Sequence, residues 1–362
     1  MLSSGFSVQQ TLLRLRAPLV AVAMLVGGDA GASVRDFNVG FSSLSTADPM
    51  GGQIQYALWY PTDVPNGTVK VGPFEFPGTR DAAPAVGTFG LVILSHGSGG
   101  SPIGHWDTAV ALVRAGFIAA GPLHPRNNIR DDIGDRRIVL DGRPLQLSAV
   151  IDALLAHESW SRRIERKKIG AFGFSAGGYT VLAALGAARV YARTLDHCER
   201  HAAEDPYCRI VNGPGHADRV REYAAPAQRS HDDRLCAGVI ADLYATPFSD
   251  AGLKAMPPVK LLFFRPEVED VLKAEFHVSR VVRLLKQRDD FPDPEEIVVQ
   301  GARHMSFLAP YPESVGRSLA GPEGFDRAAF AEEMTRRTAM HEDMNRRIVS
   351  FFRQAFADCA GG

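Results

Sequence analysis

Residues 168–178 read Lys-Ile-Gly-Ala-Phe-Gly-Phe-Ser-Ala-Gly-Gly, and this stretch decides the fold. Its apolar part predicts a buried strand, a Gly-x-Ser-x-Gly turn follows, and the Ala- and Leu-containing residues 179–185 predict a helix. A turn this sharp holds Ser175 in a strained backbone conformation and lifts its hydroxyl clear of the sheet. Gly173 and Gly177 carry no Cβ, which allows the strand and the helix to approach each other closely. The motif therefore predicts Ser175 as a nucleophile at one edge of a sheet.

Strands alternate with helices on both sides of this motif. Strands are expected twice within 37–60 and at 91–94, 117–120, 236–241, 259–264 and 296–299, and helices at 106–115, 144–160, 271–287 and 324–357. Residues 61–88 are rich in Pro and Gly and are interpreted as a loop, and the polar residues 123–142 as a loop over a site. The alternation predicts an α/β fold, with a mostly parallel central sheet and helices on both faces.

The N-terminus differs from the rest of the chain. Arg14 and Arg16 precede the apolar residues 17–26, and small residues follow up to Ala32. These are the three parts of a secretory signal peptide, and the apolar run is too short for a stable membrane span. We therefore expect a signal peptide over 1–32 and a periplasmic or secreted protein, with a cytoplasmic N-terminal helix as the alternative.

The bulk composition is that of an ordinary globular protein. A chain of 362 residues with 45% hydrophobic residues can bury a large core, and we expect one domain over 33–362 with a polar insertion at about 187–233. This insertion is interpreted either as a cap over the cleft or as a solvated surface excursion. The net charge of −1 gives no electrostatic basis for binding nucleic acid.

The four cysteines are Cys198, Cys208, Cys236 and Cys359, and none forms a Cys-x-x-Cys pair. A zinc site therefore has no support, and no metal is expected. In an exported protein Cys198 and Cys208 could close a small loop in the insertion as a disulfide. The alternative is four free thiols.

A serine hydroxyl needs a general base, and His304 is the best candidate. It follows the last predicted strand, so it should lie at the same edge of the sheet as Ser175, where the carboxyl ends of parallel strands meet. Three other histidines precede the serine, against the usual order of such residues, and are expected only to line the cleft: His96, His105 and His124.

The base needs a carboxylate to hold its tautomer, and here the sequence leaves two choices open. Glu269 follows the penultimate strand and is preferred. Asp242 follows the strand before it and is the alternative. Glu267 and Asp270 are less favoured because of their register.

An acyl-transfer site also needs donors for the oxyanion. One is expected to be the backbone N–H of Ala176, directly after the nucleophile. The other should come from the Gly-rich residues 95–101 after the strand at 91–94, and Ser98 is our choice. This loop lacks the Gly-Lys-Ser/Thr ending of a phosphate-binding loop, so no nucleotide or other cofactor is expected.

Several of these segments resemble a known family. They are Ser-His-Gly-Ser-Gly-Gly at 95–100, Gly-Phe-Ser-Ala-Gly-Gly at 173–178 and His-Met-Ser-Phe-Leu-Ala-Pro at 304–310, with support from 57–61 and 124–128. Together they resemble the predicted dienelactone hydrolases of bacteria, which are α/β-hydrolases related to platelet-activating-factor acetylhydrolases. The resemblance covers roughly residues 37–312.

The resemblance implies an α/β-hydrolase fold and a serine hydrolase that acts on a small-molecule or lipid-like ester. It implies Ser175 as nucleophile, His304 as base, and the N–H groups of Ser98 and Ala176 as the oxyanion hole. Members usually carry an aspartate at the site of Glu269, whereas the acetylhydrolase branch uses the aspartate that corresponds to Asp242. True dienelactone hydrolases use cysteine as the nucleophile, so the resemblance does not imply dienelactone as the substrate.

Two other classes of function share these features. The same triad could serve an amidase, a peptidase or an acyltransferase, because specificity resides in loops. A non-catalytic binding protein on this fold would be expected to have a damaged triad, whereas Ser175 and His304 are both present. The long helix at 324–357 either packs on the core or mediates dimerisation.

Overall fold

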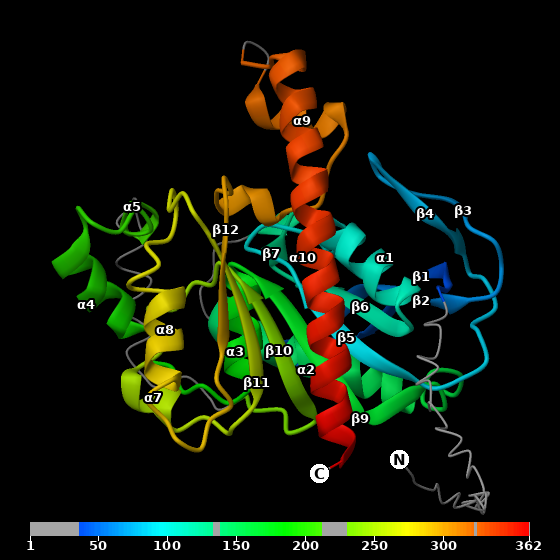
Figure 1. The fold of residues 1–362 in the computed structure, drawn as a ribbon, viewed down its shortest axis with the longest axis horizontal. Coiled ribbons are helices and arrows are strands. Elements are labelled where there is room, and N and C mark those ends of the chain that lie inside the picture. The colour runs from blue at the N-terminus through cyan, green and yellow to red at the C-terminus, as the bar shows by residue number, and fades with distance from the viewer. Residues whose placement is uncertain (1–35, 133–137, 212–229, 322–323, 362) are drawn as a thin grey trace, which may run out of the picture. The chain divides into compact units, whose positions relative to one another are not determined.

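A ten-stranded sheet runs through the part of the chain that the computed structural model describes, namely residues 36–132, 138–211, 230–321 and 324–361 (Figure 1). Its strands are β1 (Asn38–Ala47), β2 (Gln53–Thr62), β3 (Gly67–Val71), β4 (Phe74–Arg80), β5 (Phe89–Ser95), β6 (Phe117–Leu123), β9 (Ile164–Phe174), β10 (Leu235–Ala241), β11 (Lys260–Pro266) and β12 (Glu295–Val299). A separate pair is formed by β7 (Asn127–Asn128) and β8 (Asp131–Asp132). The described residues belong to one compact unit.

The strand order is β12-β11-β10-β9-β5-β6-β2-β1-β4-β3. All neighbours from β12 to β6 pair in parallel, while β2 pairs antiparallel with both β6 and β1. The predicted mostly parallel sheet is therefore confirmed. The carboxyl ends of β5, β9, β10, β11 and β12 meet at one edge, which brings the loops that follow them together.

The helices are α1 (Trp106–Arg114), α2 (Arg143–Ala156), α3 (Ala176–Ala184), α4 (Ala192–His201), α5 (Cys208–Val211), α7 (Asp250–Lys254), α8 (Val278–Leu285), α9 (Glu313–Ala320) and α10 (Arg327–Gly361). Short helical turns are η1 (Pro102–His105), η2 (Ile138–Gly142) and η3 (His304–Phe307). Within the described ranges, no helix combines the length and the apolar character needed to cross a membrane.

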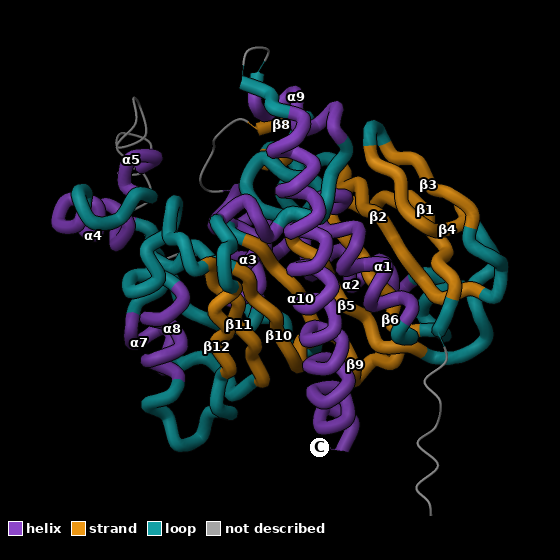
Figure 2. The backbone as a smooth tube through the Cα atoms, turned by 45° about the horizontal axis from the view of Figure 1, so that its top comes forward, coloured by secondary structure: helices purple, strands orange, loops and turns teal. Residues whose placement is uncertain are grey.

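Each face of the sheet buries its own core, because successive strand residues point to opposite sides. In β5, Leu91 and Ile93 pack on the side of α2, α3 and α8, while Val92 and Leu94 pack on the side of α1 and α10. Figure 2 shows these helices on either side of the orange strands. The predicted arrangement, with helices on both faces, is confirmed.

The interpretation of 61–88 as a loop is wrong, because β3 and β4 form a hairpin there. The segment 69–76 alternates apolar and charged residues around a Gly-Pro turn, a pattern that the overall Pro and Gly content concealed. Val69 and Phe76 are buried in the core on the α1 side, while Lys70 and Glu75 form an exposed ion pair of 2.7 Å.

One helix prediction needs correction, and one helix next to the His304 turn was not expected. The helix expected at 271–287 is confined to α8, because His277 has a non-helical backbone and its Nδ1 accepts the N–H of Ala245 at 3.0 Å. Helix α9 was not predicted. The long helix expected at 324–357 is present as α10 and packs on the sheet through Ile348 and Phe352.

The predicted signal peptide at 1–32 lies outside the described residues. Of the predicted insertion, residues 187–211 and 230–233 are described.

Cys198 and Cys208 form a disulfide, as considered from the sequence. A second disulfide, between Cys236 and Cys359, joins β10 to the end of α10 and was not predicted. No local sequence pattern indicates that Cys236 pairs with Cys359, because their contact depends on where α10 crosses the sheet.

Candidate active site

Ser175 occupies the turn between β9 and α3 with φ 54° and ψ −116°, a conformation that residues with a Cβ rarely adopt. The neighbouring strand holds it there, because the N–H of Ser175 donates a 3.0 Å hydrogen bond to the carbonyl of Ala241. The carbonyl of Ser175 accepts the N–H of Tyr179 at 3.1 Å. The turn thus has the strained backbone expected from the motif, and Ser175 is half-buried at the carboxyl end of β9.

The two glycines of the motif are required by close backbone contacts. A Cβ on Gly173 would collide with the carbonyl of Gly177, and a Cβ on Gly177 would collide with the carbonyl of Ser95. Both obstacles are main-chain atoms rather than flexible side chains. The glycines therefore allow the turn to sit directly against the end of β5.

His304 and Asp242 form a buried pair beside this turn. His304 begins η3 after β12, and its Nδ1 lies 2.5 Å from Oδ2 of Asp242, which follows β10. The imidazole packs on Phe174, the residue before Ser175, with ring centroids 4.8 Å apart. With Nδ1–H donating to the carboxylate, Nε2 is left to accept a proton.

Asp242 is buried and held in a fixed position beside His304. Asp242 is 2% exposed, and burial raises the pKa of its carboxyl while the hydrogen bond from His304 opposes that rise. Its backbone has φ 41°, and its N–H donates to the carbonyl of Phe264 at 2.8 Å, which fixes the carboxylate at the end of the sheet. Asp270 holds the His304 backbone, since its Oδ1 accepts the His304 N–H at 2.9 Å.

The sequence-based preference for Glu269 as the partner of His304 needs correction. Its carboxylate instead forms ion pairs with Arg265 at 3.7 Å and Lys273 at 3.2 Å. The chain turns after β11 so that the backbone N–H of Val268 bonds to the carbonyl of Ala302. The position of Glu269 relative to the end of β11 does not indicate this turn. The structure brings Asp242, the alternative choice, to His304.

The loop of residues 95–101, which we call the oxyanion loop after its predicted role, lies against Ser175. An added Cβ on Gly97 would lie 3.5 Å from Cβ of Ser175. Among the described residues, no carbonyl accepts a hydrogen bond from the backbone N–H of Ser98 or Ala176. The hydroxyl of Ser98 is held by Nδ2 of Asn127 at 2.9 Å. The two predicted donors therefore follow Ser175 and Gly97 directly in the chain, and neither N–H is committed to another backbone group that the structure describes.

Arg143, which the sequence did not single out, braces this loop from behind. Its guanidinium is fully buried and donates to the carbonyl of His96, to Oγ of Ser95 at 3.3 Å and to Oδ1 of Asn127 at 2.6 Å. Burial lowers the pKa of Arg143 to about 9. In the sequence Arg143 only precedes an amphipathic helix, where an arginine is usually solvated, so no local signal distinguishes it.

The three histidines expected to line the cleft are buried in the protein instead. The imidazole of His124 bonds to Oγ of Ser95 and Oε1 of Gln146, both at 2.9 Å, and its backbone N–H donates to Nε2 of His96 at 3.2 Å. Burial holds the pKa values of His96 and His124 well below the usual range, and lowers that of His105 to about 4. His96 and His124 therefore support the end of β5 and the loop that follows it.

Replacement of Arg143 by alanine should destabilise the protein by about 3–5 kcal/mol, because it leaves buried acceptors without donors. Urea unfolding followed by circular dichroism measures the change. The exposed Arg162, replaced in the same way, is the control and should cost less than about 1 kcal/mol. If both substitutions lowered the free energy of unfolding by the same small amount, this would contradict the role of Arg143 in bracing the loop.

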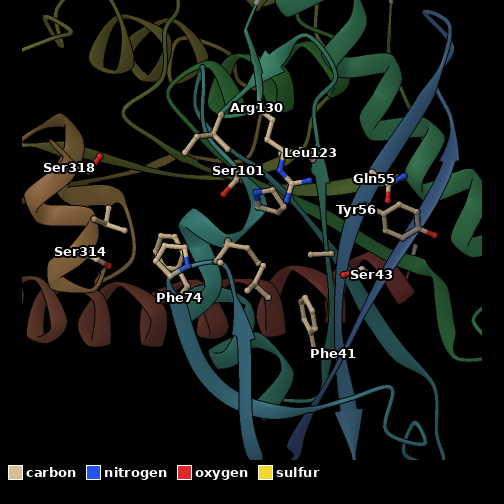
Figure 3. Close-up of a pocket in the computed structure, with 18 of the residues that line it drawn as sticks. Phe41, Ser43, Gln55, Tyr56, Phe74, Ser101, Leu123, Arg130, Ser314 and Ser318 are labelled. Atoms are coloured by element: carbon tan, nitrogen blue, oxygen red, sulfur yellow. The ribbon is translucent and has the colours of Figure 1, made fainter.

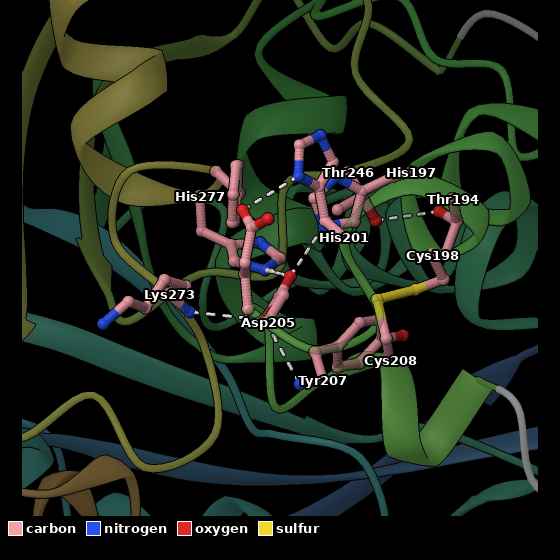
Figure 4. A network of polar contacts seen from close by, with 12 residues as sticks. Thr194, His197, Cys198, His201, Asp205, Tyr207, Cys208, Thr246, Lys273 and His277 are labelled. Carbon is pink, nitrogen blue, oxygen red and sulfur yellow. Dashed lines mark hydrogen bonds and ion pairs between the residues drawn. A yellow bond between two sulfur atoms is a disulfide. The ribbon is translucent and has the colours of Figure 1, made fainter.

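A second buried polar cluster ties the insertion to the main body (Figure 4). Oδ2 of Asp205 lies 2.8 Å from Nε2 of His197 on α4 and 3.0 Å from Nε2 of His277 before α8. Oδ1 of Asp205 accepts the backbone N–H groups of Tyr207 and Lys273. The side chain of Asp205 is completely buried. The cluster lies beside the Cys198–Cys208 disulfide and fixes the first part of the insertion.

The cluster does not make a convincing metal centre. Ligand atoms of His197, Asp205 and Cys208 lie within 4.8 Å of one another. However, the sulfur of Cys208 is bonded to Cys198 and offers no thiolate. The remaining pair of donors is already engaged in a mutual hydrogen bond.

This cluster should contribute to acid sensitivity. Burial alone would raise the pKa of Asp205, but hydrogen bonds from His197 and His277 outweigh it and bring the pKa far below its usual value. A depressed carboxyl pKa stabilises the fold above the unfolded value of about 3.9, and this contribution is lost as the pH falls. Wild-type protein should therefore lose about 1.4 kcal/mol more per pH unit below about 4 than Asp205→Asn does.

Urea unfolding between pH 6 and 3 tests this expectation, with the exposed Asp196 of α4 replaced by Asn as the control. At neutral pH, Asp205→Asn should already be less stable than the control. Parallel pH profiles for wild type and Asp205→Asn would rule out a charged Asp205 in the folded state.

Comparisons with known proteins relate the chain to others only through its fold. No family model matches it, and a search of curated proteins finds no match. Among solved structures it is similar to a ferulic acid esterase from Streptomyces cinnamoneus, with a TM-score of 0.52 and 15% sequence identity. The match covers 89% of this chain and 91% of that one. Together with the sheet topology, it confirms the predicted α/β-hydrolase fold.

Proposed function

We propose that this protein is a serine hydrolase that cleaves carboxylic esters through an acyl-enzyme on Ser175. The observation that carries the proposal is the buried pair of His304 and Asp242, placed beside a serine in a strained strand–helix turn. Nucleophile, base and carboxylate come from the ends of β9, β12 and β10. This is the edge of the sheet where the fold collects its functional loops.

The chemistry follows from these positions. Nε2 of His304 takes the proton as Oγ of Ser175 bonds to the ester carbonyl carbon, and Asp242 stabilises the imidazolium that forms. The N–H groups of Ser98 and Ala176 donate to the oxyanion of the tetrahedral intermediate. The intermediate collapses, the alcohol leaves with the proton from His304, and Ser175 remains acylated. Water, deprotonated by His304, then attacks the acyl group, and the carboxylic acid leaves as Oγ regains its proton.

The choice of esters rests on the resemblance to dienelactone hydrolases and acetylhydrolases, and is supported by the structural similarity to an esterase. The pairing of Asp242 with His304 favours the acetylhydrolase branch, in which the corresponding aspartate serves as the acid. An amidase or an acyltransferase would use the same groups. Product analysis with an added alcohol acceptor separates transfer from hydrolysis, since only transfer yields a new ester.

A fluorophosphonate probe tests for an activated serine without knowledge of the substrate. We expect one label per chain, located on Ser175 by mass spectrometry. The Ser175→Ala variant should take up no label, and prior heat denaturation should also prevent labelling of the wild type. A folded wild-type protein that does not react would favour a binding protein on this fold.

We also propose that the protein is exported to the periplasm or secreted, with residues 1–32 removed. The two disulfides support this, because such bonds persist mainly in oxidising compartments. Expression of the full chain followed by cell fractionation and N-terminal sequencing checks the proposal. A cytoplasmic product that retains Met1 would overturn it.

A further inference from the structure

A cavity of about 630 Å³ opens next to the oxyanion loop (Figure 3). Its volume falls in the range of small-molecule sites. None of Ser175, His304 and Asp242 lines it, so it is a separate feature from the catalytic groups. Figure 3 shows its walls, with Phe41 and Phe74 on one side, Arg130 and Ser101 on another, and Ser314 and Ser318 of α9 on a third.

Apolar side chains dominate this cavity. Phe41 of β1 and Ile103 of η1 are buried beneath it, and Val315 of α9 closes one side. Two of the most exposed large apolar side chains in the described residues also line it, namely Ile129 at 73% and Leu319 at 64% exposure. Exposed apolar groups gathered around a concave apolar surface indicate a site for an apolar ligand.

Two segments that border the cavity are joined to the loops that carry the proposed catalytic groups. Ser101 belongs to the oxyanion loop, and the carbonyl of Gly100 in that loop accepts the N–H of Ile129 at 2.9 Å. Helix α9 comes directly after the His304 turn, whose end is tied back by the bond from the N–H of Ala309 to the carbonyl of Gly104 at 2.8 Å. The cavity therefore adjoins the loop that carries Ser98 and the helix that follows the His304 turn.

We propose that this cavity binds the apolar group of the ester substrate, so that the enzyme prefers esters with an extended alkyl or aromatic group over acetates of small alcohols. The proposal rests on the proposed ester hydrolysis and adds the substrate class. Each buried methylene should favour binding by about fourfold. The apolar group belongs either to the acyl part or to the alcohol part, and substrates can distinguish the two.

The test fills the cavity with one bulky side chain. Ser318 is exposed on α9 and lines the cavity, so Ser318→Trp should occupy it without removing a buried contact. The matched control is Ala320→Trp, because Ala320 is exposed on the same helix and does not line the cavity. Circular dichroism and unfolding curves establish that both variants are folded.

Two series of esters serve as substrates, with p-nitrophenyl esters from acetate to octanoate varying the acyl part and acetates from ethyl to octyl varying the alcohol part. In one series, Ser318→Trp should lower the ratio of kcat/KM for the eight-carbon member to that for the two-carbon member by about tenfold or more. Ala320→Trp should leave this ratio as in wild type. The series that responds identifies which part of the ester the cavity holds.

A binding measurement separates failure of this proposal from failure of the proposed function. The probe is 8-anilinonaphthalene-1-sulfonate, whose fluorescence rises in apolar sites, and the protein is Ser175→Ala, so that no turnover occurs. Binding should weaken at least tenfold when Ser318→Trp is added and stay unchanged with Ala320→Trp.

Unchanged substrate ratios together with unchanged probe binding would overturn the cavity proposal and leave ester hydrolysis standing. Probe binding that depends on Ser318, with no hydrolysis of any ester, would keep the cavity as an apolar site and overturn the proposed function. A wild-type dimer that Ser318→Trp dissociates, seen by sedimentation velocity, would assign the cavity to a second copy of the chain and overturn the proposal.

Discussion

Replacement of Ser175 by alanine is expected to lower kcat/KM for ester hydrolysis by about 10³-fold or more. The reason is that no other hydroxyl occupies the strained turn at the end of β9, next to the oxyanion loop and the His304 pair. The measurement is release of p-nitrophenol from acetate, butyrate and octanoate esters by wild type and variant under the same conditions.

The fold should survive this substitution, because the contacts of Ser175 that hold the turn come from its backbone. Its N–H bonds to Ala241 and its carbonyl to Tyr179, and both bonds remain in the alanine variant. Matching circular dichroism spectra and melting temperatures are the control. A folded variant that retains most of the activity would refute the acyl-enzyme mechanism.

Replacement of Asp242 by asparagine is expected to lower kcat by about 10⁴-fold, by analogy with the same change in other serine triads. An amide in place of the carboxylate favours the wrong tautomer of His304 and cannot stabilise the imidazolium. The carboxylate is 2.5 Å from Nδ1 of His304, so the substitution acts directly on the proposed base. Steady-state kinetics on the best p-nitrophenyl ester measure the loss.

The matched variant is Glu269→Gln, which makes the same chemical change at the position that the sequence favoured. Glu269 is paired with Arg265 and Lys273 rather than with His304, so kcat should change by less than about threefold. Full activity in Asp242→Asn with a large loss in Glu269→Gln would instead identify Glu269 as the carboxylate that supports His304.

Local sequence patterns predicted most of the fold because they report on local physics. Apolar runs with β-branched residues gave the positions of β5, β10 and β11, and the Gly-x-Ser-x-Gly motif gave the turn at Ser175. The β3–β4 hairpin does not follow from the overall composition of 61–88, because its Gly-Pro turn is also typical of a loop, although 69–76 alternates. The start of α8 lies later than expected because His277, directly before the helix, is bonded to a distant backbone N–H, that of Ala245.

The sequence by itself determined the strand–turn–helix around Ser175, the order of strands along the chain, and the candidates on the loops that follow them. These features follow from hydrophobic periodicity and from the conformational freedom of glycine, and both properties depend on only a few neighbouring residues. Only the tertiary structure decided which carboxylate meets His304, that Arg143 braces the oxyanion loop, and that Cys236 pairs with Cys359. Each of these depends on contacts between segments far apart in the chain, whose positions are set when the sheet packs against its helices.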